Sequence, residues 1–228
     1  MSTNTQWLAS VQSLAEAQSL NACLPDMLDM KQPAKGALGA LPLDVVSDIV
    51  RWNANRCLTS ATIGDLPMQA PMIESAIHQM AKTGVDFVKV GLFGGDEQAD
   101  CLQALTPFIS QQNTPVIAVM FADRQYDNDV ITQIVNTGFR GVMIDTADKN
   151  GQSLLDLWST EALTEFVQKI KSADRLCGLA GALRLGDIAT LRALQPDYLG
   201  FRSALCPERN RNGSLSAALA KSIAAALQ

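Results

Sequence analysis

Histidine is nearly absent from this chain of 228 residues, which contains only His78. That residue lies in the helical pattern of residues 72–81, where a lone histidine is best explained by a place on the helix surface or in its packing. A single histidine argues against a histidine-based metal site, and the expected place of His78 on a helix argues against a Ser-His-Asp triad. Acid–base chemistry, if there is any, must use lysine, carboxylate or tyrosine.

Cysteine pairs of the kind that build a disulfide framework or a zinc site are also missing. The five cysteines are an odd number with no C-x-x-C spacing, which fits reduced thiols in a cytosolic core. Residues 1–6 lack the charged and apolar regions of a signal peptide, and no apolar stretch approaches the length of a membrane span. We therefore expect a soluble, cytoplasmic protein.

An excess of positive charge is the third absence. The chain has 18 lysine and arginine residues against 23 aspartate and glutamate residues, a net charge of −5. This balance argues against a general nucleic-acid-binding protein, whose footprint is a basic surface, but it allows a local basic pocket for a phosphorylated metabolite. We expect a small-molecule substrate as the partner, with no nucleic acid and no membrane. A homo-oligomer stays open, because an apolar stripe on an outer helix can face another helix or another subunit.

Apolar runs typical of buried strands alternate with helical patterns along the chain. The expected strands are residues 7–11, 26–31, 58–64, 87–93, 115–121, 141–147, 176–183 and 198–205. The expected helices are residues 14–24, a helix from 42, 71–83, a helix ending near 110, 129–137, 160–172, 187–194 and a helix from 215.

Alternating βα units imply a parallel sheet, and eight of them imply closure into a single (β/α)8 TIM barrel over residues 1–228. The alternative is an open doubly wound sheet, but no G-x-G-x-x-G follows the first strand to seat a dinucleotide. No linker rich in proline, glycine or serine marks a domain boundary. One barrel domain is therefore the prediction.

Charged residues at strand ends are the candidate catalytic groups. Asp29 and Lys31 share one face of the second expected strand, and Lys89 lies in the middle of the fourth, where buried parallel strands are usually apolar throughout. Asp145 ends the sixth strand and leads to Lys149. A solvated strand end explains Asp29 and Lys31 equally well when they are taken alone. Alternate strands share an interior layer, however, so all five groups can meet at the carboxyl end of the barrel.

Three lysines brought together have a chemical use. An isolated lysine has a pKa of about 10.4, and neighbouring positive charge and desolvation both lower it towards the free amine that attacks a carbonyl. A Schiff-base lysine beside a second cation is an established nucleophile, and nearby aspartates can move protons. The structural alternative is a buried network in which the aspartates merely pair with the lysines.

The last two expected strands carry glycines that fit a phosphate site. Gly178, Gly181 and Gly200 lie in or just after these strands, where barrels often bind phosphate through backbone amides, and Arg202 adds charge. Close packing is an equally good reason for glycine in a strand. Together, the lysines and the glycines suggest a carbonyl substrate that carries a phosphate.

These residues lie in longer motifs that occur in one order through nearly the whole chain. The motifs are Asp29-Met-Lys31-Gln-Pro with Gly36-Ala-Leu-Gly-Ala40, Ala61-Thr-Ile-Gly-Asp65, Asp86-Phe-Val-Lys-Val-Gly-Leu-Phe-Gly94, Asp145-Thr-Ala-Asp-Lys-Asn-Gly151, Gly178-Leu-Ala-Gly181 and Pro196-Asp-Tyr-Leu-Gly-Phe-Arg202. In this set the chain closely resembles the (5-formylfuran-3-yl)methyl phosphate synthase family, also called 4-(hydroxymethyl)-2-furancarboxaldehyde-phosphate synthases.

The resemblance implies a TIM-barrel lyase that condenses two molecules of glyceraldehyde 3-phosphate into the phosphorylated furan precursor of methanofuran. It implies that Lys31 forms the Schiff base with Asp29 beside it, that Lys89, Asp145 and Lys149 complete the active site, and that no metal or organic cofactor is required. Two rival interpretations stay open: a lysine-dependent aldolase on another sugar phosphate, and a barrel that binds a phosphorylated metabolite without catalysis.

Overall fold

The computed structural model of the protein describes residues 5–148 and 150–227, and within them every expected strand is present. The strands are β1 (Gln6–Val11), β2 (Met27–Met30), β3 (Leu58–Thr62), β4 (Phe87–Gly91), β5 (Val116–Phe121), β6 (Gly141–Asp145), β7 (Leu176–Leu179) and β8 (Tyr198–Phe201).

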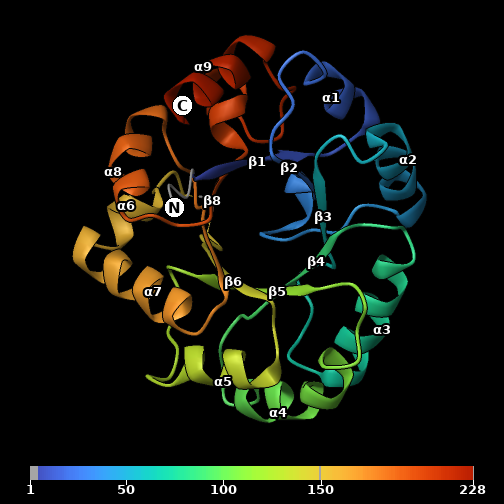
Figure 1. Ribbon diagram of the computed structural model, residues 1–228, viewed down its shortest axis with the longest axis vertical. Coiled ribbons are helices and arrows are strands. Elements are labelled where there is room, and N and C mark those ends of the chain that lie inside the picture. Colours follow the sequence, from blue (N-terminus) through green and yellow to red (C-terminus); the bar gives the residue numbers. More distant parts are fainter. Residues whose placement is uncertain (1–4, 149, 228) are drawn as a thin grey trace.

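The strands form a closed barrel in the order β1 to β8, and all neighbouring pairs are parallel. The first strand closes on the last, with Gln6 opposite Tyr198 and Ala9 opposite Phe201. Figure 1 shows this ring of strands surrounded by helices. The predicted TIM barrel is therefore confirmed, and the open sheet is excluded.

The helices cover the outside of the barrel (Figure 1). They are α1 (Leu14–Ser19), α2 (Leu43–Asn53), α3 (Ala70–Ala81), α4 (Gln98–Ile109), α5 (Val130–Thr137), α6 (Leu154–Leu157), α7 (Thr160–Ser172), α8 (Ile188–Ala193) and α9 (Ala217–Leu227). Short 3-10 helices are η1 (Pro33–Lys35), η2 (Leu185–Asp187), η3 (Ser203–Leu205) and η4 (Pro207–Arg209). No helix in the described ranges is long and apolar enough to cross a membrane.

Some boundaries differ from the sequence expectation for local physical reasons. The strand β7 ends at Leu179, four residues early, because Gly181 and Ala182 turn the chain with φ angles of +108° and +45°. The helix α6 was not expected, since four residues are too few for a helical pattern. It follows Ser153, whose N–H donates a hydrogen bond to the Asp156 carboxylate at 2.8 Å.

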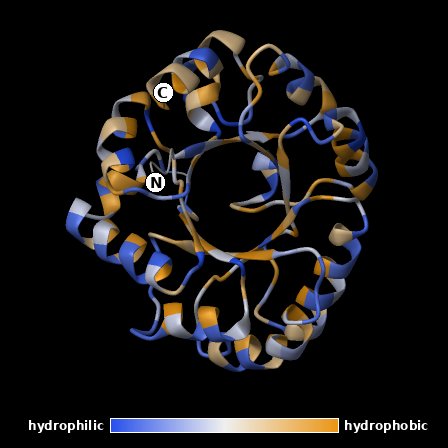
Figure 2. Cartoon of the chain, in the orientation of Figure 1, coloured by the Kyte–Doolittle hydropathy of each residue, from blue (hydrophilic) through white to orange (hydrophobic). Residues whose placement is uncertain are grey.

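The alternation of side chains along each strand divides the core into two layers. Residues such as Val88, Val90 and Leu92 point outward and pack with the helices in a large cluster. A smaller cluster, including Leu8 and Phe121, fills the barrel interior. Figure 2 shows hydrophobic residues concentrated in the strands and recurring along the helices between hydrophilic stretches. Polar groups that point into the interior are therefore exceptions to an apolar lining.

Aspartates stand just before several strands at the amino-terminal end of the barrel. Asp26 accepts a hydrogen bond from the N–H of Trp7 at 2.8 Å, and Asp197 accepts one from the N–H of Cys177 at 2.7 Å. Asp86 accepts from both the N–H and the hydroxyl of Thr59, each at 2.7 Å. These carboxylates bond strand-edge backbone groups and stabilise the end of the barrel opposite to the candidate site.

Candidate active site

Two lysine–aspartate pairs lie inside the carboxyl half of the barrel. Lys89 of β4 and Asp29 of β2 form an ion pair with 2.8 Å between Nζ and Oδ1, and their side chains are 1% and 3% exposed. Lys31, which directly follows β2, lies 3.5 Å from Oδ2 of Asp145 at the end of β6, with side chains 10% and 6% exposed. The structure thus brings four of the five predicted catalytic residues together. The fifth, Lys149, lies outside the described residues.

The Asp29 carboxylate is held by Lys89 and by two serine hydroxyl groups. Ser10 donates its hydroxyl to Oδ2 at 3.0 Å, and Ser60 donates to Oδ1 at 2.6 Å. Burial raises the pKa of Asp29, but the ammonium groups of Lys89 and Lys31 and the hydrogen bonds outweigh burial, so the net shift is downward. Asp29 is therefore an anion at neutral pH. Neither serine belongs to the set of predicted site residues.

Lys89 is among the largest fully buried side chains in the described ranges. Burial holds its pKa below the usual lysine value, and the charge of Asp29 opposes this effect only in part. Its Nζ lies 5.8 Å from the centroid of the Tyr198 ring. A side chain on Gly91 would meet Phe93 and Leu38, so this glycine makes room for apolar packing.

A cavity of about 290 Å³ opens above these pairs at the carboxyl end of the barrel. Lys31 and Asp145 line it, whereas Asp29 and Lys89 lie deeper and do not. Other lining residues come from the ends of β6, β7 and β8 and from the loops that follow: Met143, Asp148, Gly181, Ala182, Gly200, Arg202, Arg209 and Arg211. The 3.5 Å pair is therefore the one that a bound molecule can reach.

The predicted phosphate-site residues divide into two groups. Gly181, Gly200 and Arg202 line the cavity. The successive N–H groups of Gly181 and Ala182 have no hydrogen-bond acceptor within the described ranges, which suits an anion. Gly178 lies deeper, where an added methyl group would overlap the Tyr198 ring. The structure thus gives Gly178 a packing role, and its contact with phosphate stays a prediction.

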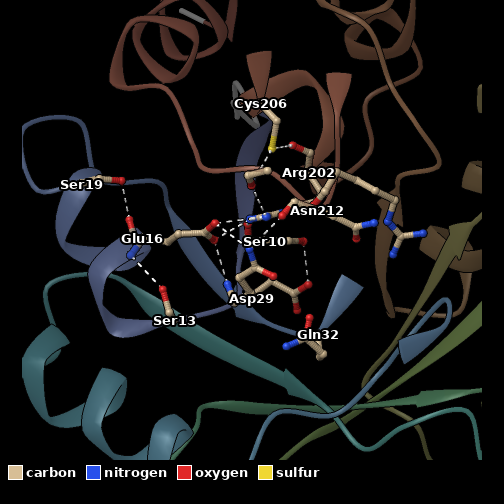
Figure 3. Close-up of polar contacts among 12 residues, drawn as sticks. Ser10, Ser13, Glu16, Ser19, Asp29, Gln32, Arg202, Cys206 and Asn212 are labelled. Atoms are coloured by element: carbon tan, nitrogen blue, oxygen red, sulfur yellow. Dashed lines mark hydrogen bonds and ion pairs between the residues drawn. The ribbon is translucent and has the colours of Figure 1, made fainter. Parts of the chain in front are cut away.

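Arg202 is committed to protein partners. Its guanidinium donates to both carboxylate oxygens of Glu16 and to the backbone oxygens of Ser10, Arg211 and Gly213. Figure 3 shows Glu16 and Arg202 facing each other next to Ser10 and Asp29. Since these bonds use all five N–H groups, direct contact between Arg202 and a phosphate requires one of them to break.

The loop after Lys31 is held in place by Asp65, which follows β3. Its carboxylate accepts hydrogen bonds from the N–H groups of Ala37 and Leu38 at 2.9 and 2.7 Å. Gly36 has a φ angle of +106°, and any side chain there would overlap the Asp65 carboxylate. Asp65 and Gly36 therefore fix the backbone next to the candidate nucleophile.

Comparison with known proteins decides the family. Residues 7–224 match the model of the family described as 4-HFC-P synthase. The chain belongs to this family. A protein of Methylorubrum extorquens, provisionally named as a (5-formylfuran-3-yl)methyl phosphate synthase, is 39% identical over 95% of this chain and 89% of its own length. The synthase of Methanococcus maripaludis strain C7 is 32% identical over 95% of this chain and 96% of its own. The predicted resemblance is confirmed.

Solved structures agree with the barrel of this 4-HFC-P synthase family member. The 3-keto-L-gulonate-6-phosphate decarboxylase of Vibrio cholerae superimposes with a TM-score of 0.68, covering 98% of this chain and 97% of its own, at 12% sequence identity. At such low identity the likeness concerns the fold alone.

The predicted site of this 4-HFC-P synthase family member did not include Arg209 and Arg211, which line the cavity. Both lie between the expected last strand and last helix, in a stretch with no periodic pattern. The available signal was two arginines shortly after the final strand, where loops of a barrel surround the site.

Proposed function

We propose that this protein condenses two molecules of glyceraldehyde 3-phosphate into (5-formylfuran-3-yl)methyl phosphate, a step of methanofuran biosynthesis. Atom balance requires that one phosphate and two waters leave. The family supports the product, since relatives across most of the chain carry the name of this synthase. The position of Lys31 on the cavity wall, paired with Asp145, supports the mechanism.

Lys31 acts as the nucleophile in this proposal. Its amine attacks the aldehyde carbon of one triose phosphate, and the carbinolamine loses water to give an imine. Asp145, at 3.5 Å, is placed to take the proton that leaves the ammonium group and to return it to the departing oxygen. The imine then acidifies the neighbouring C–H bond, which allows enolisation and loss of phosphate.

Lys89 and Asp29 act below the cavity floor. Their ion pair keeps a positive and a negative charge beneath Lys31, and burial lowers the pKa of Lys89. Because they do not line the cavity, we assign them an electrostatic role in support of Lys31 and Asp145 during carbon–carbon bond formation and ring dehydration. The N–H groups of Gly181 and Ala182 are the proposed ligands of one substrate phosphate.

Borohydride trapping tests this function. The protein is incubated with glyceraldehyde 3-phosphate and borohydride, and its peptides are analysed by mass spectrometry. We expect an adduct on Lys31 and, without borohydride, a product with the ultraviolet absorbance of a furan; both should disappear in Lys31→Ala. An adduct on Lys89 would overturn the assignment of the nucleophile. An adduct on Lys31 with a non-absorbing aldol product would overturn the furan and favour an aldolase.

A further inference from the structure

Most charged side chains that line the cavity form ion pairs, and the exceptions lie on one loop. Asp145 pairs with Lys31, and Asp148 pairs with Arg124 at 2.9 Å. The remaining cations belong to the loop between η3 and α9, residues 206–216, here called the arginine loop. Neither Arg209 nor Arg211 forms an ion pair with a residue in the described ranges. Among the described residues, the cavity wall therefore carries two positive charges without a carboxylate partner.

The two arginines reach towards different parts of the cavity mouth. Arg209 donates to the backbone oxygen of Ala182, next to the free N–H groups that follow β7. Arg211 donates to the backbone oxygen of Gly36 at 3.1 Å, in the loop that follows Lys31. One cation thus lies beside the proposed phosphate-binding amides, and the other lies beside the loop of the candidate nucleophile.

Arg211 is a partly buried cation whose donors are mostly unused. It is half-buried, and the contact with Gly36 is its one side-chain hydrogen bond in the described ranges, although a guanidinium has five N–H groups. Burial holds its pKa below the usual value, while the charge of Asp145 opposes that shift. Burying a charge that lacks an ion-pair partner is costly, so a half-buried Arg211 on the cavity wall points to an anionic ligand.

The arginine loop is fixed before any ligand binds. Arg202 donates to the backbone oxygens of Arg211 and Gly213 at 2.8 and 2.9 Å, and Glu16 anchors Arg202 in turn (Figure 3). Arg209 and its neighbour Glu208 have φ angles of +57° and +54°, which non-glycine residues seldom adopt. A site held in this way loses little entropy when it binds a ligand.

We propose that Arg211 binds the phosphate of the aldehyde that reacts with Lys31, and that Arg209 binds the phosphate of the second aldehyde. A phosphate monoester carries about −1.5 to −2 charges at neutral pH, and the planar guanidinium fork matches its oxygens. The inference rests on the proposed function, because a reaction between two phosphorylated aldehydes must hold two phosphates. It explains why the arginine loop points one cation to each side of the cavity mouth.

The test measures how borohydride trapping on Lys31 depends on aldehyde concentration, with glyceraldehyde 3-phosphate and with unphosphorylated glyceraldehyde. For Arg211→Gln we expect the half-saturating concentration of the phosphorylated aldehyde to rise about tenfold to a hundredfold, as for loss of a charged hydrogen-bond partner. The half-saturating concentration of unphosphorylated glyceraldehyde should not change. Arg211→Lys should recover part of the loss, and Arg209→Gln should affect only the concentration needed for furan formation.

Arg51→Gln is the matched control, because Arg51 is an exposed arginine on the outer helix α2. An Arg211→Gln variant that traps both aldehydes like the wild type overturns the proposal, as does an equal loss for both aldehydes. If the wild type traps no aldehyde, the Schiff-base function fails. Calorimetric titration with inorganic phosphate then tests phosphate binding by Arg211 independently of that function. Weaker phosphate binding in Arg211→Gln then supports the anion site, and unchanged binding overturns it.

Discussion

The two lysine–aspartate pairs have the same chemistry but different surroundings. Lys89 and Asp29 are 2.8 Å apart on the barrel floor, and two serines bond the carboxylate. Lys31 and Asp145 are 3.5 Å apart and line the cavity. The depth of each pair in the barrel therefore separates their roles. The polar groups of the deep pair bond to other protein groups, whereas the upper pair exposes its amine to a ligand in the cavity.

The largest effect is expected from Lys31→Ala. If the upper pair performs the chemistry, the rate of furan formation should fall by about a thousandfold or more, as for loss of an essential catalytic group. The free energy of unfolding should change less than on mutation of the deep pair, because water in the cavity can solvate Asp145. Steady-state kinetics and urea denaturation measure the two quantities. Full activity in this variant would remove the distinction between the pairs.

Asp29→Asn should produce the largest loss of stability. The amide oxygen can still accept a hydrogen bond from one of the two serines, and its NH2 group can donate to the other. The Lys89 ammonium is left buried without a counter-charge, however, which costs about 3 to 5 kcal/mol. Adding Lys89→Met should recover part of this loss. The matched control is Asp48→Asn, which breaks an exposed pair with Arg51 and should cost about 0.5 kcal/mol or less. Equal losses in both urea experiments would show that the deep pair is not special.

The deep pair also predicts how stability depends on pH. The pKa of Asp29 is lowered in the fold, so its stabilisation is present above its unfolded pKa of about 3.9 and is lost as pH falls through the folded value. The advantage of the wild type over Asp29→Asn should therefore shrink in acid. The pKa of Lys89 is also lowered, so the unfolded chain binds its proton more tightly, and stability rises as pH approaches about 10.4.

Denaturation midpoints of the wild type, Asp29→Asn and Lys89→Met across this pH range would check both signs. The pairing is contradicted if the stability advantage of the wild type over Asp29→Asn grows as the pH falls. It is also contradicted if the stability of the wild type relative to Lys89→Met falls as the pH rises.

Most of the fold could be predicted because each strand is a short apolar run that ends at a glycine, proline or charged residue. Prediction failed where structure depends on local backbone geometry. The early end of β7 depends on positive φ angles at Gly181 and Ala182, and the start of α6 depends on the hydrogen bond from the Ser153 N–H to Asp156. Neither feature produces a periodic pattern.

The site was predictable where a charge interrupts an apolar strand, as Lys89 does in β4. The hydrogen-bond partners of Asp29 could not be predicted. Ser10 and Ser60 are ordinary residues, and their contact with Asp29 depends on the register of β1, β2 and β3. The commitment of Arg202 to Glu16 depends on contact between residues 186 positions apart. Such contacts follow from closure of the barrel and leave no trace in local sequence.

The smallest effect concerns the packing beneath the deep pair. Gly178→Ala should push the Tyr198 ring from its place near Lys89 and destabilise the protein by about 1 to 3 kcal/mol, the usual range for an overpacked core. Gly186→Ala is the matched control, because apart from its two chain neighbours no described residue has an atom within 4 Å of the added methyl group. Phosphate binding should be retained in Gly178→Ala if this glycine serves packing. A loss of phosphate affinity with unchanged unfolding would instead assign Gly178 to the cavity, and the boundary between barrel floor and binding site would then lie one layer deeper.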